Sequence, residues 1–554
     1  MFKKTNKTFN WSDFLPLAIL GLVGAWLLFF NLGKASLQDW DEGIYALISQ
    51  AAAKQASLTL SLNNEAWFEK PPLGFWLEAL SIKAFGFSEW AIRLPAAIAL
   101  LGSVILIYLL GKELFNRRLA WLAALLTLIS PAFFYQHMVR SGDLEGGLLF
   151  FTLLAFYYLV KSEQKSKYLA WSGAAAGLAF MYRGGSAVFI LIISLVYLFL
   201  SGNWKKFKAK HWLAYAGVWL VIVLPWHLQQ LLVHGRAFWQ VYFEEQLLGR
   251  LGAPLQNHSG PWHYYFDYFN HANLMLQMAI WPALLYTSFK LWFRREKKIL
   301  LPWLWFVLSI VLLSAMATKL RWYLITAIPP MMLLFVYWLS DLLKAKRGLT
   351  IMIWALTADA LMVYYWLAKV DVFNIFKFDS RRRWLFLLLA LGLSGLFWLL
   401  NYLKTKQVNF KFWPLSFLLS LIVGLNLLYA RRAYNQVINN QPAAVVVAAQ
   451  VLAKTAPAPR AVAVYRVLEW YKGWILPQAD YYFSRRGGYQ LSLIKAGELK
   501  AAVESGKYNL FLTDAVGLQE LNLAGDSRYT ISEFFTTTYD QSTKLILAHK
   551  LSKF

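Results

Sequence analysis

The chain has 554 residues, of which 59% are hydrophobic and 15% are charged. Soluble globular proteins average about 25% charged residues, so this composition excludes an ordinary soluble domain and indicates a membrane protein. The net charge of +26 would suit a nucleic-acid partner, but Lys and Arg gather in short loops between apolar runs, where they orient helices and contact anionic headgroups. The absence of cysteine excludes disulfides, thiolate nucleophiles and cysteine-ligated metals.

Long apolar runs dominate the chain from its N-terminal end onward. The first run follows a basic N-terminal segment and has no evident cleavage site, so we expect a retained membrane span and not a cleaved signal peptide. A membrane helix needs about 20 apolar residues. By this measure the sequence predicts about thirteen spans, near residues 14–33, 92–112, 119–136, 143–160, 167–182, 184–200, 211–233, 273–293, 299–317, 322–341, 349–368, 384–403 and 412–430.

The charged loops predict how these spans are oriented. Seven basic segments, from the N-terminal tail to residues 404–411, fall on one side if there are thirteen spans, and the positive-inside rule makes that side cytoplasmic. The exception is "DSRRRW" at residues 379–384. The N-terminus is therefore expected in the cytoplasm of a bacterium, and segments 34–91 and 234–272 are expected to face outward from the plasma membrane.

The tail from residue 431 is also expected outside. It mixes charged residues with β-like runs such as "RAVAVYRV" and "STKLILAHKL" and with a helical run, "AAVVVAAQVLAK". These patterns predict a small α/β domain over residues 431–554, attached to a transmembrane catalytic domain over residues 1–430. No internal repeat of the kind found in many secondary transporters is evident.

The first outward segment carries two polar clusters. Asp41 and Glu42 follow the first span within about ten residues, and Glu69 and Lys70 precede two consecutive prolines. Prolines hold the backbone extended, so Lys70 is expected on a stiff approach to the next helix, where its ammonium group suits a lipid phosphate. The alternative for these residues is ordinary: juxtamembrane acids are often solvated, and lysines often extend toward headgroups.

Further charged residues enter the membrane from the same predicted side. Asp143 and Glu145 lie at the start of the fourth span, and Arg183 precedes two glycines that allow an outward turn. Asp143 could also act only as a favourable charge at a helix N-terminus. The remaining outward candidates are Glu244, Glu245, Arg250, His258, His263, Lys319, Arg321 and Tyr323.

Together these residues suggest group transfer from a phosphate-linked lipid. Acids such as Asp41 and Asp143 can accept a proton or orient a nucleophile. Cations can bind a phosphate and stabilise it as it leaves. The convergence of both kinds of residue on one side of the membrane favours this chemistry.

With these residues in view, the chain resembles the bacterial lipid-linked glycosyltransferases of the GT-C superfamily, in the branch that includes protein O-mannosyltransferases and ArnT, the aminoarabinose transferase of lipid A. The resemblance covers roughly residues 14–345. It is carried by "DWDEGIYALIS", "FEKPPLGFW", "RSGDLEGGLLFF", "MYRGG", "YFEEQLLGR", "HYYF" and "KLRWYLITAIPP" in this order.

The resemblance implies roles for individual residues. Asp41 matches the catalytic aspartate of the family's Asp-Glu motif, with Glu42 beside it and Asp143 as a second acid. The residues implied in binding the donor's phosphate are Lys70, Arg250 and Tyr323, with Arg183, Arg321 and Lys319 as helpers.

The resemblance also implies a divalent metal ion held by Glu69. The second ligand there is a histidine in ArnT-like enzymes, whereas this chain has Glu245, which argues against zinc. Ile44 stands where ArnT enzymes tend to carry an arginine, which argues against aminoarabinose and lipid A in particular.

The sequence therefore predicts an α-helical, polytopic GT-C glycosyltransferase that moves a sugar from undecaprenyl phosphate to lipid A or another acceptor at the outer face of the inner membrane. A protein O-glycosyltransferase or a surface-polysaccharide enzyme of the same fold is the first alternative. A lipid flippase would explain the spans but needs midplane sites open to both sides, and a non-catalytic scaffold would tolerate loss of Asp41. The sugar, the acceptor and the oligomeric state are left open.

Overall fold

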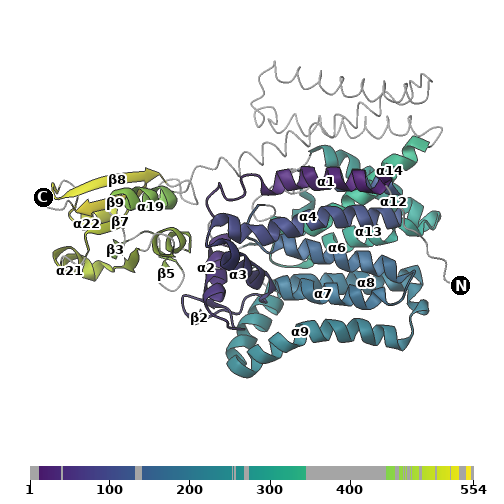
Figure 1. Cartoon of the computed structure of the whole chain (residues 1–554), viewed down its shortest axis with the longest axis horizontal. Coiled ribbons are helices and arrows are strands. Elements are labelled where there is room, and N and C mark those ends of the chain that lie inside the picture. Colours follow the sequence, from purple (N-terminus) through teal and green to yellow (C-terminus); the bar gives the residue numbers. More distant parts are fainter. Residues whose placement is uncertain are drawn as a thin grey trace, which may run out of the picture.

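Long apolar helices lie side by side and form the larger part of the molecule (Figure 1). The computed structural model describes residues 11–38, 41–130, 140–252, 254, 258–267 and 274–344, and residues 444–550 with short gaps. The bundle helices are α1 (Trp11–Phe29), α4 (Glu89–Leu114), α5 (Arg117–Leu128), α6 (Glu145–Ser162), α7 (Tyr168–Arg183), α8 (Val188–Ser201), α9 (Ala209–Phe238), α12 (Leu274–Phe293), α13 (Leu300–Ala315) and α14 (Ile328–Lys344).

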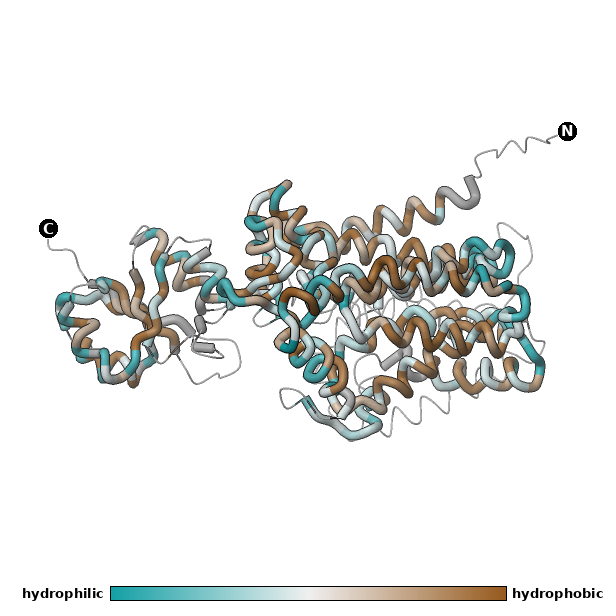
Figure 2. Tube along the Cα trace, turned by 90° about the horizontal axis from the view of Figure 1, so that it is seen from below, coloured by the Kyte–Doolittle hydropathy of each residue, from teal (hydrophilic) through white to brown (hydrophobic). Residues whose placement is uncertain are grey.

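Five helical stretches of the described residues are long and apolar enough to cross a membrane. They are residues 89–114, 168–201, 209–249, 297–315 and 321–342, and a shorter apolar helix covers 15–29. Figure 2 shows apolar residues along the length of the bundle and more polar residues at its ends. The chain is therefore a multi-pass membrane protein. The predicted spans at 349–368, 384–403 and 412–430 lie outside the described residues.

Local signals in the sequence set several helix boundaries. The hydroxyl of Ser88 accepts a hydrogen bond from the Ala91 N–H at the start of α4, and the Asn116 side chain accepts from Arg118 and Leu119 at the start of α5. Such caps satisfy backbone donors that the first turn leaves unpaired. The residues 167–182 and 184–200, predicted as two spans, form α7 and α8 joined by one short turn, η2 (Gly184–Ala187).

Glycines let the central helices approach closely. A Cβ added at Gly147 of α6 would lie 2.1 Å from the Tyr182 ring of α7. A Cβ added at Gly173 of α7 would lie 2.4 Å from the backbone oxygen of Tyr215 in α9. Small residues at helix crossings allow this close packing in membranes. These contacts hold α6, α7 and α9 together beneath the polar end of the bundle.

The segment of residues 34–91, which the sequence predicts to face outward, folds across one end of the bundle. It contains α2 (Asp41–Lys54), the short hairpin of β1 (Ser61–Leu62) and β2 (Glu65–Ala66), and α3 (Leu73–Phe85). After α9 bends at Gly235, the chain continues as a π-helical segment, η4 (Trp239–Gly249), and a last turn, α10 (Arg250–Gly252). This bend brings the η4 segment over the same end of the bundle as α2 and α3 (Figure 1). Three further short segments belong to the bundle, η3 (Asn203–Lys206), η6 (Lys297–Ile299) and η7 (Arg321–Ala327).

A mixed five-stranded sheet forms the C-terminal part of the structure. Its strand order is β6-β3-β7-β9-β8, with β3 parallel to β6 and β7, and β9 antiparallel to β7 and β8. The predicted β-runs and helical run are present. The elements are α19 (Ala444–Thr455), β3 (Ala461–Val464), β4 (Glu469–Trp470), β5 (Trp474–Ile475), α20 (Pro477–Ala479), η10 (Asp480–Arg485), β6 (Gln490–Leu493), η11 (Ala496–Glu498), α21 (Leu499–Glu504), β7 (Leu510–Thr513), α22 (Ala515–Glu520), β8 (Tyr529–Phe535) and β9 (Lys544–Lys550).

Alternating side chains divide the sheet between two apolar clusters. Val462 and Val464 pack in one cluster together with α19 and with residues of α2, whereas Ala463 packs in another with residues of α21 and α22. This is the period-two pattern of a strand buried on both faces. One face of the C-terminal sheet therefore shares its core with the helix that begins at Asp41.

Candidate active site

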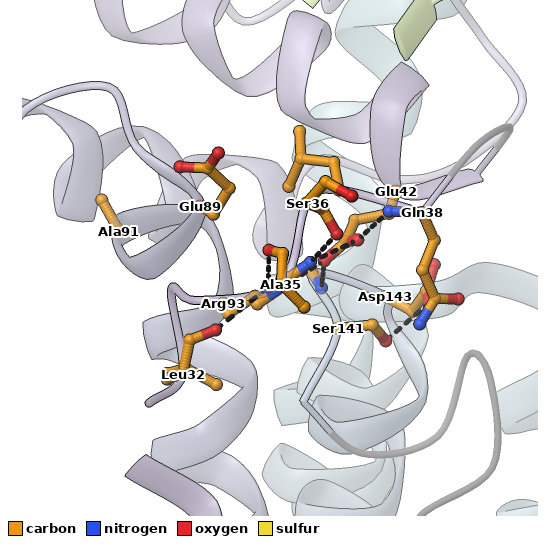
Figure 3. A network of polar contacts seen from close by, with 12 residues as sticks. Leu32, Ala35, Ser36, Gln38, Glu42, Glu89, Ala91, Arg93, Ser141 and Asp143 are labelled. Atoms are coloured by element: carbon orange, nitrogen blue, oxygen red, sulfur yellow. Dashed lines mark hydrogen bonds and ion pairs between the residues drawn. The ribbon is translucent and has the colours of Figure 1, made fainter. Parts of the chain in front are cut away.

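A buried ion pair anchors the start of α2 to the bundle (Figure 3). Arg93 of α4 donates from Nε to Glu42 Oε1 at 2.7 Å and from Nη2 to Glu42 Oε2 at 2.9 Å. The two side chains are 2% and 0% exposed. Arg93 also donates to the backbone oxygens of Leu32, Ala35 and Ser36, so the turn that leads from α1 to α2 wraps around one guanidinium group.

The same carboxylate connects the two predicted acidic segments. Glu42 Oε1 accepts a hydrogen bond from the Gly142 N–H at 2.8 Å, and Oε2 accepts one from the Gln38 N–H at 2.5 Å. Asp143, the next residue after Gly142, accepts from the Ser141 hydroxyl at 2.7 Å and is buried. Glu42 thereby joins the turn before Asp41 to the turn before α6, although they are about a hundred residues apart in sequence.

A second group of polar residues is joined by hydrogen bonds and contains three of the predicted phosphate-binding residues, Lys70, Arg250 and Tyr323. Lys70 Nζ donates to Gln246 Oε1 at 3.1 Å. Arg250 donates to the same oxygen from Nη2 at 2.8 Å and from Nε at 3.2 Å, and its Nη1 donates to the Tyr323 hydroxyl at 2.7 Å. Two cations from distant segments thus share one neutral amide oxygen. We call Lys70, Gln246, Arg250 and Tyr323 the cation row.

Arg183 connects the cation row to the acidic turns. Its Nη1 lies 2.5 Å from Glu145 Oε1, and both side chains are buried. Its guanidinium carbon lies 5.6 Å from the centre of the Tyr323 ring, in cation–π range. Arg183 therefore braces Tyr323 while its charge is balanced by the first residue of α6.

The charge of Asp41 acts on the pKa of residues in both groups. Burial lowers the pKa of Lys70 to about 7, the charges of Arg250 and Arg183 lower it as well, and Glu69 and Asp41 act in the opposite direction. Burial also raises the pKa of Tyr45, one helical turn after Asp41, and the charges of Asp41, Glu145 and Asp143 raise it further against Arg183. Asp41 itself is half-buried at the start of α2. The predicted acids and cations therefore meet at one end of the bundle.

Two predicted phosphate-binding residues lie in other surroundings. The ammonium group of Lys319 donates to the backbone oxygens of Leu313, Ser314 and Met316 at the C-terminal end of α13. Cations stabilise such helix ends because the last carbonyl groups lack helical partners. Arg321 is exposed at the start of η7. The charge of Lys319 is thus engaged in capping α13.

The predicted metal ligands Glu69 and Glu245 are both exposed. Within the part of the chain that the structure describes, no group of three or more His, Cys, Asp or Glu side chains is arranged to hold a metal ion. The described donors therefore do not supply a complete ligand set for a divalent metal ion.

Three residues of this site were not singled out from the sequence. Arg93 and Gln246 provide the central partners of Glu42 and of the cation row, and the pKa of Tyr45 responds to the charges of Asp41 and Arg183. A lone arginine in a long apolar helix was the available signal for Arg93, because such a charge needs a partner. Gln246 carries no charge, and nothing in its neighbourhood in the sequence distinguishes it.

The sequence is similar to one protein family and to several curated transferases. Residues 69–228 match the family described as dolichyl-phosphate-mannose-protein mannosyltransferase. Undecaprenyl phosphate-alpha-4-amino-4-deoxy-L-arabinose arabinosyl transferase 2 of Pseudomonas fluorescens is 28% identical over 348 residues, which are 59% of this chain and 60% of that protein. The corresponding transferase of Pseudomonas savastanoi is 30% identical, over 59% of this chain and 62% of its own length. The chain thus matches about 60% of the length of these curated relatives.

Solved structures extend the likeness over nearly the whole chain. ArnT from Cupriavidus metallidurans, in its crystal structure bound to undecaprenyl phosphate, has a TM-score of 0.68 at 18% identity and covers 96% of this chain and 97% of its own. The archaeal oligosaccharyltransferase AglB from Archaeoglobus fulgidus has a TM-score of 0.51 at 13% identity, over 96% of this chain and 74% of its own. The fold is therefore the one seen in these two solved structures. The resemblance to ArnT and to protein mannosyltransferases that the sequence predicts is confirmed as a similarity of sequence and fold.

Proposed function

We propose that the protein is a glycosyltransferase that takes a sugar from undecaprenyl phosphate, or a similar polyprenyl phosphate, and moves it to an acceptor at the outer face of the inner membrane. The observation that carries this proposal is the cation row, in which Lys70 and Arg250 share one neutral oxygen within electrostatic reach of Asp41. The names of the relatives, which specify undecaprenyl phosphate, support it.

The chemistry explains why two cations are useful here. In a polyprenyl phosphate-sugar the phosphate is a diester with one negative charge, and it leaves as a monoester with additional charge. Groups that bind the phosphate more tightly as this charge develops lower the barrier to transfer. Lys70, Arg250 and the Tyr323 hydroxyl can each donate to a phosphate oxygen, and we assign them this role.

Asp41 is the proposed catalytic acid-base residue. Its carboxylate orients an acceptor hydroxyl and accepts its proton as the oxygen attacks the anomeric carbon, while the bond from that carbon to the phosphate oxygen breaks. A glycosidic bond forms, and polyprenyl phosphate leaves on the cation row. Asp143 is proposed to contact the acceptor. Glu42 is assigned to positioning, because both of its oxygens already accept hydrogen bonds from Arg93 and from backbone N–H groups.

Arg183 and Arg321 are assigned supporting roles. Arg183 holds Tyr323 toward Arg250 through its cation–π contact and its ion pair with Glu145. Arg321 is exposed, so we limit it to a peripheral contact with the donor headgroup.

Three acceptor classes are compatible with the proposed donor chemistry. The names of the curated relatives favour a lipid A-like acceptor, and the family match over residues 69–228 favours a protein hydroxyl. Ile44 replaces the arginine expected of aminoarabinose transferases, so we do not assign that sugar. A surface-polysaccharide acceptor would use the same donor chemistry.

The membrane arrangement is part of the proposal. We place about thirteen spans in residues 1–430, with a cytoplasmic N-terminus and with α2, α3 and η4 at the outer surface. The C-terminal residues 431–554 are proposed to form an extracytoplasmic α/β domain. Support comes from the basic loops and from the five-stranded sheet beside α2.

Transfer of labelled sugar tests the function. Purified protein would receive a radiolabelled polyprenyl phosphate-sugar and a bacterial membrane extract, and the products would be separated into lipid, glycan and protein fractions. We expect transfer that is abolished by Asp41→Asn and strongly reduced by Lys70→Ala. The control is Glu113→Gln, which alters an ion pair with Lys161 at the other end of α4 and should leave transfer intact. Absence of transfer from every donor, by protein that still binds polyprenyl phosphate, would contradict the proposal.

A further inference from the structure

The C-terminal region holds the backbone of the turn that precedes Asp41. The Leu37 N–H donates to the Tyr482 hydroxyl at 2.9 Å, and the Leu37 oxygen accepts from Gln478 Nε2 at 2.8 Å. The Tyr482 hydroxyl in turn donates to Glu89 Oε1 at 3.0 Å. Leu37 and Gln478 are 1% and 3% exposed, so these bonds are shielded from water. We call Gln478 and Tyr482 the Leu37 clamp.

The clamp acts on the residues closest to Asp41. Leu37 precedes Gln38, whose N–H donates to Glu42 and whose side chain lies beside Ser141 and Asp143 in Figure 3. On the other side of Asp41, α20 packs against Gly43, where an added Cβ would lie 3.3 Å from Pro477 Cβ and 3.4 Å from the Gln478 nitrogen. The short segment Pro477–Tyr482 therefore contacts the chain both before and after Asp41.

Burial makes these contacts effective. A backbone N–H or C=O group that is buried without a partner costs more than the net value of a hydrogen bond, so the turn at Leu37 is held where the two side chains reach it. The Glu42–Arg93 pair fixes the same turn from within the bundle. The C-terminal region supplies the second attachment, from outside the bundle.

We propose that Gln478 and Tyr482 are positioning residues for transfer: by holding Leu37 they set the position of the Asp41 carboxylate relative to the donor bound on the cation row. This inference rests on the proposed glycosyltransferase function. It gives the C-terminal region a part in catalysis that does not depend on contact with donor or acceptor. Neither residue lies among those assigned to bind phosphate, so the clamp affects the chemical step more than donor binding.

Steady-state transfer and donor binding, measured on the same full-length preparations, separate these effects. Tyr482→Phe and Gln478→Ala are each expected to lower kcat about tenfold, the order of one buried hydrogen bond, while the Kd for the polyprenyl phosphate-sugar stays within about twofold of wild type. Tyr529→Phe is the matched control. Tyr529 lies in β8, packs on Phe511 and is expected to behave as wild type.

The outcomes distinguish the inference from the function on which it rests. Wild-type kcat in both clamp variants would overturn the inference and leave the function standing. An equal loss of kcat and donor affinity would also overturn it, because the clamp would then only support the fold. If neither the wild type nor Tyr529→Phe transfers sugar while both bind donor, the proposed function itself fails.

Discussion

Two groups of charged residues lie within one end of the bundle, one buried and one half-buried, and they differ in how completely their charges are neutralised. In the Glu42–Arg93 pair, a carboxylate faces a guanidinium in two hydrogen bonds, and nearby backbone groups occupy the remaining positions. In the cation row, Lys70 and Arg250 meet a neutral amide oxygen in place of an anion. Removing one partner of a complete buried pair leaves an uncompensated charge, whereas cations gathered around a neutral acceptor suit an anionic ligand.

The largest effect on stability should come from breaking the complete pair. Arg93→Met would leave Glu42 buried without its countercharge, and we expect a loss of about 3–5 kcal/mol in the free energy of unfolding. Thermal unfolding in detergent would measure this. Arg528→Met, which removes an exposed ion pair with Asp526, should leave the unfolding temperature unchanged. An Arg93→Met protein as stable as wild type would show that the Glu42–Arg93 pair is not needed for stability.

Substitution in the cation row should give the opposite pattern. Arg250→Met is expected to weaken donor binding by about 10- to 100-fold, since a hydrogen bond to a charged group contributes about 1.5–3 kcal/mol. The unfolding temperature should stay close to that of wild type. Equilibrium binding of a labelled donor would test this, with Lys161→Met at the other end of the bundle as the control. An unchanged affinity of Arg250→Met for the donor would show that the donor's phosphate binds elsewhere.

The lowered pKa of Lys70 predicts that donor binding depends on pH. With a pKa of about 7, Lys70 is charged below that pH. A bound phosphodiester raises this pKa because it favours the charged ammonium group. The affinity for the donor should therefore be full below pH 7 and fall as the pH rises above 7. We expect a loss of about tenfold between pH 6 and pH 8. The diester does not titrate in this range. Lys70→Arg, which stays charged, should give a flat profile; an equally steep profile would assign the effect to another group.

The smallest effect concerns a second buried carboxylate, Glu78 of α3. Its described hydrogen bond comes from the Ser49 hydroxyl at 2.6 Å, and burial raises its pKa well above the ordinary 4.5. An acid whose pKa is raised by folding makes the folded state less stable as pH increases above its ordinary pKa. Glu78→Gln should therefore gain stability over wild type as the pH rises above 4.5. Parallel unfolding temperatures of the two proteins above this pH would contradict the expectation.

Much of the site could be predicted because the membrane restricts where charge can lie. Counting spans and basic loops assigned Asp41, Lys70, Asp143, Arg183 and Arg250 to one side, and the structure brings these residues to one end of the bundle. Helix boundaries followed from apolar runs and from caps such as Ser88 and Asn116. Both inferences rely on local pattern and on the cost of placing charge in lipid.

Pairing between distant residues could not be predicted in this way. Glu42 and Arg93 are 51 residues apart in the sequence, and their contact depends on how the start of α2 packs on α4. Gln246 was overlooked because its role arises from position alone, and Lys319 was assigned to phosphate because its sequence context does not reveal the end of α13. The clamp on Leu37 joins residues more than four hundred positions apart, which no local pattern reports.

The most direct test of the central claim is a structure of the protein with a polyprenyl phosphate-sugar bound. The account predicts that the phosphate lies between Lys70 and Arg250, accepts hydrogen bonds from both and from the Tyr323 hydroxyl, and displaces Gln246 Oε1 from at least one of the two cations. The anomeric carbon should then face Asp41. A phosphate bound away from Lys70 and Arg250, with their hydrogen bonds to Gln246 unchanged, would contradict the account.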